Sequence, residues 1–249
     1  MLLQIALKDA GRQERQRMAE NNALILQSCI NWKADMVKAL DWLEPIHSAY
    51  AEYWNMDYWS NREQVIETDD PDYNPAWDRI KLMMDLLDEE RYEYIFWIDH
   101  DCVIVDFSTD LRVGLDEGKN LGLVMHPGIP GHPQMGAHFN MGVILLRCND
   151  LTKEFMHEVW DRRFSGPPWY EQDVVNGLLR DFKWMKMFQI ADDKFNSTLQ
   201  VNDSPEPVIM AFHGHGQHHD VDYRLDLMKQ AYDHFNVEKQ IETVKNSSA

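Results

Sequence analysis

Two aspartates separated by one residue, Asp99 and Asp101, are the residues of this chain whose type and spacing most clearly suggest chemistry. In an extended segment, side chains at positions i and i+2 point to the same side, so both carboxylates could bind one hard divalent cation. Such a cation would neutralise the diphosphate of a bound nucleotide and would stabilise charge on a departing phosphate. The alternative to a metal site is that the two aspartates are simply polar residues at the end of a strand.

A histidine-rich segment, Phe212 to Asp220, offers further metal ligands. Neutral imidazoles in a glycine-rich turn can bind manganese or other transition metals, and the glycines would let the backbone approach a phosphate closely. His213 is the preferred ligand because it lies nearest to the end of an apolar run, and His215 is the alternative. A solvated turn would explain the same composition.

Two more polar groups stand beside apolar segments. Asn140 and Gly142 directly precede an apolar run, where the asparagine could hydrogen-bond to a polyhydroxyl ligand and the glycine could permit a close approach. Glu171, Gln172 and Asp173 lie at the expected start of a helix. Carboxylates in a first helical turn are also explained by the helix dipole alone, so neither group is specific by itself.

The apolar patterns predict the elements that position these residues. Expected strands cover 23–26, 94–98, 121–125, 142–146 and 208–212. Expected helices cover 36–55, which Pro45 should kink or divide, a segment from 77 onward, about 150–162, 170–181 and 221–240, with loops at 60–76 and 126–138. This alternation predicts an α/β fold with a mostly parallel central sheet flanked by helices, in which ligands bind at the carboxyl ends of the strands.

Composition excludes several classes of function. The chain has 249 residues and a formal net charge of −18, which argues against a nucleic-acid or anionic-membrane surface. Three widely spaced cysteines indicate neither a disulfide framework nor a cysteine zinc site. The start of the sequence has no signal-peptide hydrophobic stretch, and no apolar run is long enough to span a membrane, so a cytoplasmic protein is expected. We predict a helical extension over 1–22 and a single domain over 23–249.

Taken in order, these features resemble the GT-A glycosyltransferases, which have a Rossmann-like nucleotide-sugar-binding fold, and most closely the galactosyl/mannosyl/xylosyltransferase family of fungal and plant Golgi enzymes. The segments that carry the resemblance are His47–Ala51, Met56–Trp59, Trp77–Arg79, Trp97–Asp101, Asn140–Val143 and Glu171–Asp173. Two departures stand out: Arg79 replaces a lysine of the family pattern, and His213 matches the family's late histidine only with a two-residue shift.

The resemblance implies a metal-dependent, retaining transfer of a hexose or pentose from a UDP- or GDP-sugar to a saccharide or other hydroxyl acceptor, by a soluble bacterial or viral relative. It implies that Asp99 and Asp101 bind Mn²⁺ or Mg²⁺ at the donor diphosphate, with His213 as the third protein ligand. His215 stays open as the alternative third ligand.

The resemblance also implies roles for the remaining polar groups. Arg79 would approach the donor phosphates or sugar, and Asn140 and Glu171 would contact the donor sugar. Gln172 would lie near the anomeric carbon, which with Glu171 makes it a candidate catalytic residue. Asp173 would belong to the donor-binding set.

Two other functions are open from the sequence. A metal-dependent hydrolase could use Asp99, Asp101 and the histidines to activate water, although the chain lacks an H-E-x-x-H pattern. A non-catalytic carbohydrate-binding protein with a degenerate transferase fold could use some of the nine tryptophans as stacking platforms. The retained carboxylates count against degeneration. The sequence is compatible with several UDP- and GDP-sugar donors and with several hydroxyl acceptors.

Overall fold

A computed structural model describes residues 21–29, 34–67, 74–128, 136–163, 170–199, 201–213 and 221–247. A central sheet of six strands has the order β2-β1-β3-β8-β5-β9. Its strands are β1 (Ala23–Ser28), β2 (Asp57–Asn61), β3 (Tyr94–Ile98), β5 (Leu121–Leu123), β8 (Val143–Arg147) and β9 (Phe188–Ile190). Five of them run in one direction and β8 runs antiparallel to both neighbours, which confirms the prediction of a mostly parallel sheet.

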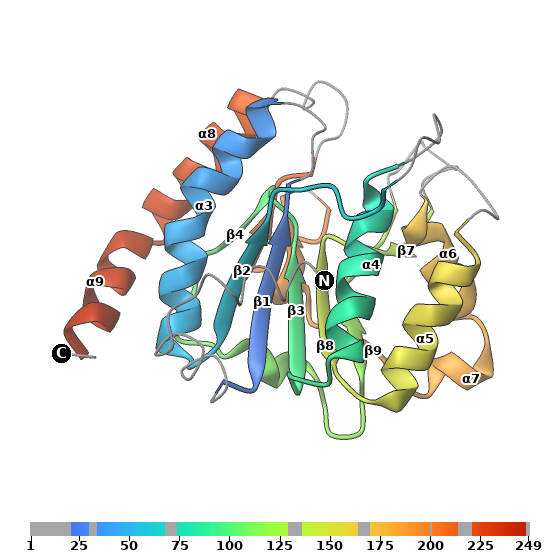
Figure 1. Ribbon diagram of the computed structural model, residues 1–249. Helices are drawn as coiled ribbons and strands as arrows, with labels where there is room; N and C mark the ends of the chain where they lie inside the picture. Colours follow the sequence, from blue (N-terminus) through green and yellow to red (C-terminus); the bar gives the residue numbers. More distant parts are fainter. Residues whose placement is uncertain are drawn as a thin grey trace.

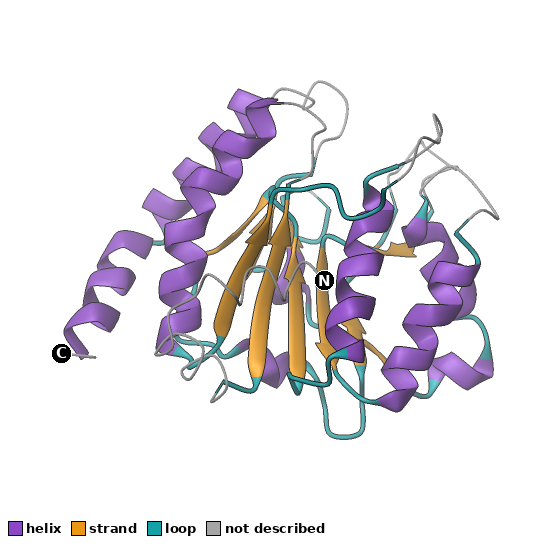
Figure 2. Cartoon of the chain, viewed as in Figure 1, coloured by secondary structure: helices purple, strands orange, loops and turns teal. Residues whose placement is uncertain are grey.

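Helices cover both faces of the central sheet (Figures 1 and 2). One face packs against α3 (Ala34–Tyr53), α8 (Val221–His234) and α9 (Val237–Ser247), and the other against α4 (Ala76–Asp88), α5 (Asp150–Asp161), α6 (Glu171–Leu178) and α7 (Phe182–Met185). Successive strand residues feed the two cores alternately, because side chains along a strand point to opposite faces. In β3, Phe96 and Ile98 join the first core, whereas Ile95 and Trp97 join the second.

A small second sheet extends the edge where β3 ends. It consists of β10 (Ser197–Thr198), β11 (Ile209–Ala211) and β4 (Cys102–Ile104), with Ala211 opposite Cys102 in an antiparallel pair. The short strands β6 (Met125–His126) and β7 (His138–Phe139) pair separately, and two 3-10 helices cover Leu111–Gly114 and Asp193–Asn196. The sequence patterns predicted β11 but not β4 or β10, since strands of two or three residues carry almost no periodicity.

Several predicted boundaries differ from the structure for identifiable reasons. Of the two effects predicted for Pro45, division of the helix does not occur: α3 continues through Pro45, which lies on the exposed side, where water can satisfy the carbonyl that its missing N–H leaves free. The predicted helix 221–240 is two helices, because Asn236 adopts a left-handed conformation (φ 52°) that ends α8. Strand β2 takes the first residues of the predicted loop 60–76. The predicted extension over 1–22 lies almost wholly outside the described residues.

Candidate functional site

A cleft of about 490 Å³ opens at the carboxyl ends of β1 and β3. Because β8 is antiparallel to β3, the chain entering β8 lies at this same edge, where the backbone N–H of Asp99 donates to the carbonyl of Gly142 over 2.8 Å. The residues that line the cleft are Ser28, Cys29, Asn74, Pro75, Ala76, Arg79, Trp97, Asp99, His100, Asn140, Met141, Gly142, Tyr170, Glu171, Gln172, His213 and Arg224.

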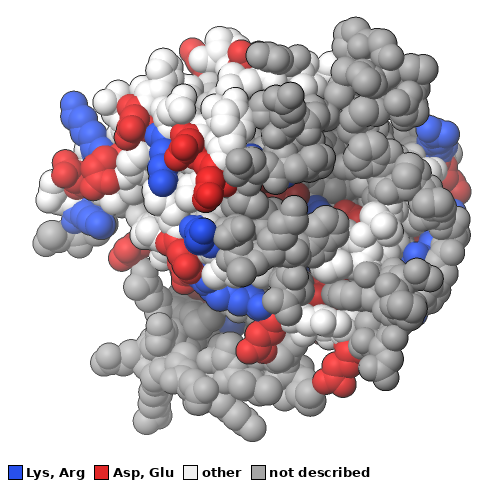
Figure 3. All heavy atoms as spheres, turned by 90° about the horizontal axis from the view of Figure 1, so that it is seen from above, with Lys and Arg blue, Asp and Glu red and all other residues white. Residues whose placement is uncertain are grey.

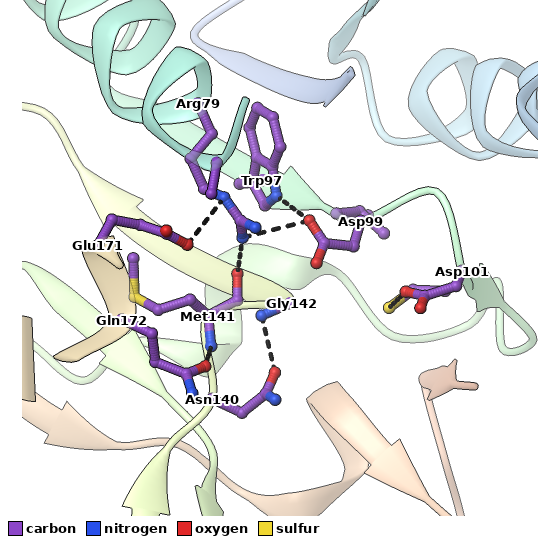
Figure 4. Close-up of polar contacts among 12 residues, drawn as sticks. Arg79, Trp97, Asp99, Asp101, Asn140, Met141, Gly142, Glu171 and Gln172 are labelled. Carbon is purple, nitrogen blue, oxygen red and sulfur yellow. Dashed lines mark hydrogen bonds and ion pairs between the residues drawn. The ribbon is translucent and has the colours of Figure 1, made fainter. Parts of the chain in front are cut away.

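Arg79, from the first turns of α4, connects several walls of the cleft (Figure 4). Its Nη1 donates to the carbonyl of Met141 over 2.7 Å and lies 3.3 Å from Oδ1 of Asp99. Its Nε lies 3.3 Å from Oε1 of Glu171, and the guanidinium carbon is 5.3 Å from the centre of the Trp97 ring. Arg79 therefore pairs with two carboxylates, that of the buried Glu171 and that of the half-buried Asp99, while it faces the cleft.

Asp99 follows β3 directly and lines the cleft as the sequence predicts. Its Oδ1 accepts a hydrogen bond from the indole N–H of Trp97 over 2.6 Å. Burial raises the pKa of Asp99; the nearby Arg79 opposes that shift and Asp101 adds to it.

Asp101 does not lie on the same side of an extended chain as Asp99, so that expectation is wrong. The chain turns after β3, and the N–H of Cys102 donates to the carbonyl of Asp99 over 3.0 Å. The carboxylate of Asp99 contacts Trp97 and Arg79, whereas that of Asp101 lies apart from this group (Figure 4). Oδ2 of Asp101 accepts a hydrogen bond from Nη1 of Arg224 over 3.0 Å.

The pKa of Asp101 is shifted in the opposite direction to that of Asp99. Burial acts to raise the pKa of Asp101, but His100, His213 and Arg224 together hold it below its ordinary value. Asp101 is thus the carboxylate of the pair that stays ionised most readily. No spacing pattern pointed to Arg224, which lies eleven residues beyond His213 along the chain.

His213 follows β11, as predicted, and the second sheet brings it beside Asp101. The N–H of Phe212 donates to the carbonyl of Asp101 over 2.9 Å, in continuation of the β4–β11 ladder. Nε2 of His213 is 3.3 Å from Oγ1 of Thr198, and its ring stacks on that of His126 with centres 5.0 Å apart. The alternative ligand, His215, lies outside the described residues.

Asn140 is fixed by hydrogen bonds on one side of its amide. Its Oδ1 accepts from the N–H of Gly142 over 2.7 Å and from Nδ2 of Asn196 over 2.8 Å. This orientation leaves the Asn140 Nδ2 as the amide group able to donate to a ligand in the cleft. A side chain at position 142 would crowd this arrangement, because a Cβ there would lie 2.8 Å from Oδ1 of Asn140.

The start of α6 brings Glu171 and Gln172 into the cleft, whereas Asp173 is not among the described residues that line it. Oε1 of Gln172 accepts from the N–H of Met141 over 3.0 Å. Burial raises the pKa of Glu171 to about 7, against the opposing effect of Arg79. Tyr170, which precedes α6, holds a left-handed φ of 51°, a strained conformation of the kind that proteins keep at functional sites.

A buried hydrogen-bond network of Gln27 and His47 holds the backbone around Asp99. Nε2 of Gln27 donates to the carbonyls of Ile98 and Asp99 over 3.3 and 3.4 Å, and its Oε1 is 2.8 Å from Nδ1 of His47. Nε2 of His47 accepts from the N–H of Ile104 over 3.2 Å, which requires a neutral ring protonated at Nδ1. Burial lowers the pKa of His47 to about 3, in agreement with that state. A glutamine inside an apolar strand was the available sequence signal for this network.

The donor set of the expected cation site fits a divalent metal in its chemistry. Asp101 is ionised and lies close to the imidazole of His213, and carboxylate and imidazole are ligands that Mn²⁺ accepts. Within the part of the chain that the structure describes, no three His, Cys, Asp or Glu side chains gather as a ready metal site. Where the view from above shows described residues, basic and acidic side chains lie next to one another (Figure 3). Among the described residues, Arg62 forms ion pairs with Asp41 and Glu44.

Comparison with known proteins connects this geometry to a family. Residues 44–228 match the family described as nucleotide-diphospho-sugar transferase. No curated protein sequence matches the chain. None of the helices in the described residues combines the length and apolar character that crossing a membrane requires.

Solved structures share the fold. A glycosyltransferase involved in the glycosylation of the major capsid of PBCV-1 is 14% identical, with a TM-score of 0.62 over 84% of this chain and 98% of that chain. The apo form of the glycosyltransferase GlyE of Streptococcus pneumoniae TIGR4 is 12% identical, with a TM-score of 0.50 over 87% of this chain and 64% of that chain. At such low identity these likenesses establish the fold alone.

Proposed function

Because this chain belongs to the nucleotide-diphospho-sugar transferase family and has the GT-A glycosyltransferase fold, we propose that it transfers a hexose or pentose from a UDP- or GDP-sugar to a hydroxyl acceptor, with the help of a divalent cation and with retention of anomeric configuration. The observation that carries the proposal is the convergence of Arg79, Asp99, Asn140 and Glu171 on one cleft at the carboxyl edge of the sheet. The family favours glycosyl transfer over hydrolysis or carbohydrate binding without catalysis.

Asp99, Asp101 and His213 are the residues that would hold the cation. When bound, Mn²⁺ or Mg²⁺ would supply positive charge to stabilise the departing diphosphate. Arg79 adds a fixed positive charge on the same side of the cleft, since its guanidinium is held by Asp99, Glu171 and the carbonyl of Met141. A preorganised cation stabilises developing negative charge without having to move during the reaction.

The sugar of the donor would lie between β8 and α6. Asn140 offers an N–H donor of fixed orientation. Glu171 has a pKa of about 7, and its buried Oε2 has no hydrogen-bond partner among the described residues, so it can accept from a sugar hydroxyl. Gln172 is held by the N–H of Met141 and stands beside both residues in the cleft lining. These contacts support the proposal that Gln172 lies near the anomeric carbon of the donor.

A donor screen tests the proposed function. We expect one UDP- or GDP-sugar to raise the melting temperature of the wild type only when Mn²⁺ is present, and to be hydrolysed slowly. At a donor concentration of 100 times Kd, the stabilisation is about 2.7 kcal/mol, or roughly 5–10 °C. Asp101→Asn should abolish the shift, whereas Asp116→Asn, the same change at an exposed aspartate on another edge, should preserve it.

The same screen can also contradict the proposal. If no nucleotide sugar shifts the melting curve or is hydrolysed, with or without Mn²⁺, the cleft does not bind a donor of this class and the catalytic assignment fails.

A further inference from the structure

Arg224 binds the carboxylate that the proposed function assigns to the cation. Its Nη1 lies 3.0 Å from Oδ2 of Asp101, and the two side chains are only 13% and 10% exposed. Arg224 stands in the first turns of α8, which packs against β4, the strand that follows Asp101 directly. The pair therefore links the turn between β3 and β4 to α8, and its low exposure shows that it is not a loose surface contact.

The charges around the cleft are close to balance before any ligand binds. Three carboxylates, those of Asp99, Asp101 and Glu171, face the two guanidinium groups of Arg79 and Arg224. Glu171 is only partly ionised near neutral pH, because its pKa is raised to about 7. A divalent cation that entered alone would leave an excess of positive charge in a half-buried site, which is unfavourable at low dielectric. A cation that entered together with an anionic diphosphate would keep the balance.

We propose that Arg224 is a built-in counter-ion of Asp101 that keeps the affinity for divalent cations low until the donor diphosphate binds. The inference rests on the proposed function, which assigns Asp101 as a cation ligand. Arg224 is a positioning residue in this scheme: it holds the carboxylate in place in the donor-free protein and excludes a lone cation. The negative charge of the diphosphate takes over the neutralisation of Arg224 when cation and donor bind together.

Binding of the metal alone is the direct test, since it does not depend on knowing the donor. Mn²⁺ is titrated into the donor-free protein and the free ion is followed by electron paramagnetic resonance. Arg224→Gln should bind Mn²⁺ about tenfold more tightly than the wild type, because a hydrogen bond between charged groups contributes at least that factor. Arg224→Lys, which keeps the positive charge, should restore weak binding. Asp101→Asn combined with Arg224→Gln should abolish the gain.

A matched control excludes an effect of overall charge. Lys153→Gln also removes one positive charge, but Lys153 pairs with Asp88 at the far end of α4. The Lys153→Gln protein should therefore bind Mn²⁺ with the affinity of the wild type. Melting curves without metal identify any variant that does not fold, and the lysine variant supplies the comparison if the glutamine variant fails.

Two other outcomes separate this inference from the proposed function. If Arg224→Gln binds Mn²⁺ no more tightly than the wild type, while Asp101→Asn loses binding, the counter-ion inference is wrong and the cation assignment stands. If no variant binds Mn²⁺, with or without a nucleoside diphosphate, both are overturned.

Discussion

Replacing Glu171 by glutamine should change how the stability of the protein depends on pH. Glu171 is 3% exposed, and burial raises its pKa from 4.5 to about 7. The folded state therefore favours the protonated carboxyl, so the associated stability is fully present below about pH 4.5 and is lost as the pH rises through about 7. Between about pH 5 and about pH 8 these two values correspond to a loss of about 2.5 kcal/mol. Glutamine has nearly the same shape and no titratable proton, so this loss should disappear.

Three charged groups around Glu171 also act on its pKa. Arg79 of α4 lowers its pKa, whereas Asp99 beyond β3 and Asp173 of its own helix raise it. Other groups titrate over the same range, so the measured quantity is the difference between the wild type and Glu171→Gln. Between about pH 5 and about pH 8, we expect the unfolding free energy of Glu171→Gln to rise by about 2.5 kcal/mol relative to that of the wild type. This corresponds to roughly 5–10 °C in melting temperature.

Urea or thermal unfolding at several pH values, with a chelator present, measures this gap. Parallel stability curves for the two proteins across the whole range would refute the reasoning, because they would mean that Glu171 titrates in the folded protein as it does in the unfolded chain. A gap that moves in the opposite direction would mean that the pairing with Arg79 outweighs burial.

Two further changes test the supports of the cleft. Gly142→Ala should displace the Asn140 amide and lower donor hydrolysis about tenfold in a kinetic assay, whereas Gly177→Ala, where an added Cβ meets nothing within 4 Å, should leave it unchanged. Gln27→Leu should lower the free energy of unfolding by about 2 kcal/mol or more in a urea titration, because it strands the Nδ1–H of the buried His47. A leucine variant as stable as the wild type would show that the network contributes nothing to stability.

The sequence alone was sufficient to predict most of the fold. Long apolar runs and regular helical spacing identified β1, β3, β8 and α4 through α6, since these elements are buried on one or two faces and their patterns are strong. Strand direction is not encoded in such patterns, so the reversal of β8 was not predicted. The division between α8 and α9 coincides with the left-handed backbone conformation of Asn236, which no periodicity reveals.

The sequence predicted which residues lie in the candidate site, but it did not predict which of their side chains contact one another. Asp99 directly follows β3, Asn140 lies three residues before β8 and Glu171 begins α6, and such positions at the ends of strong elements can be read from the sequence. The separation of Asp101 from Asp99 depends on a tight turn, and its contact with Arg224 depends on the packing of α8 against β4. Both are tertiary effects, which composition and spacing do not express.

The reversal of β8 is what makes this site possible. Val143 pairs with Ile98 in antiparallel register, so the residues before β8 meet the residues after β3. If β8 ran parallel to β3, its entry would lie at the opposite edge of the sheet, a strand length of about 16 Å away. The hydrogen bond from Asp99 to Gly142 would be lost, and with it the proximity of Asn140 to the aspartate segment. One antiparallel strand in a parallel sheet therefore brings the sugar-facing amide and the cation-facing carboxylates of the proposed function to the same edge.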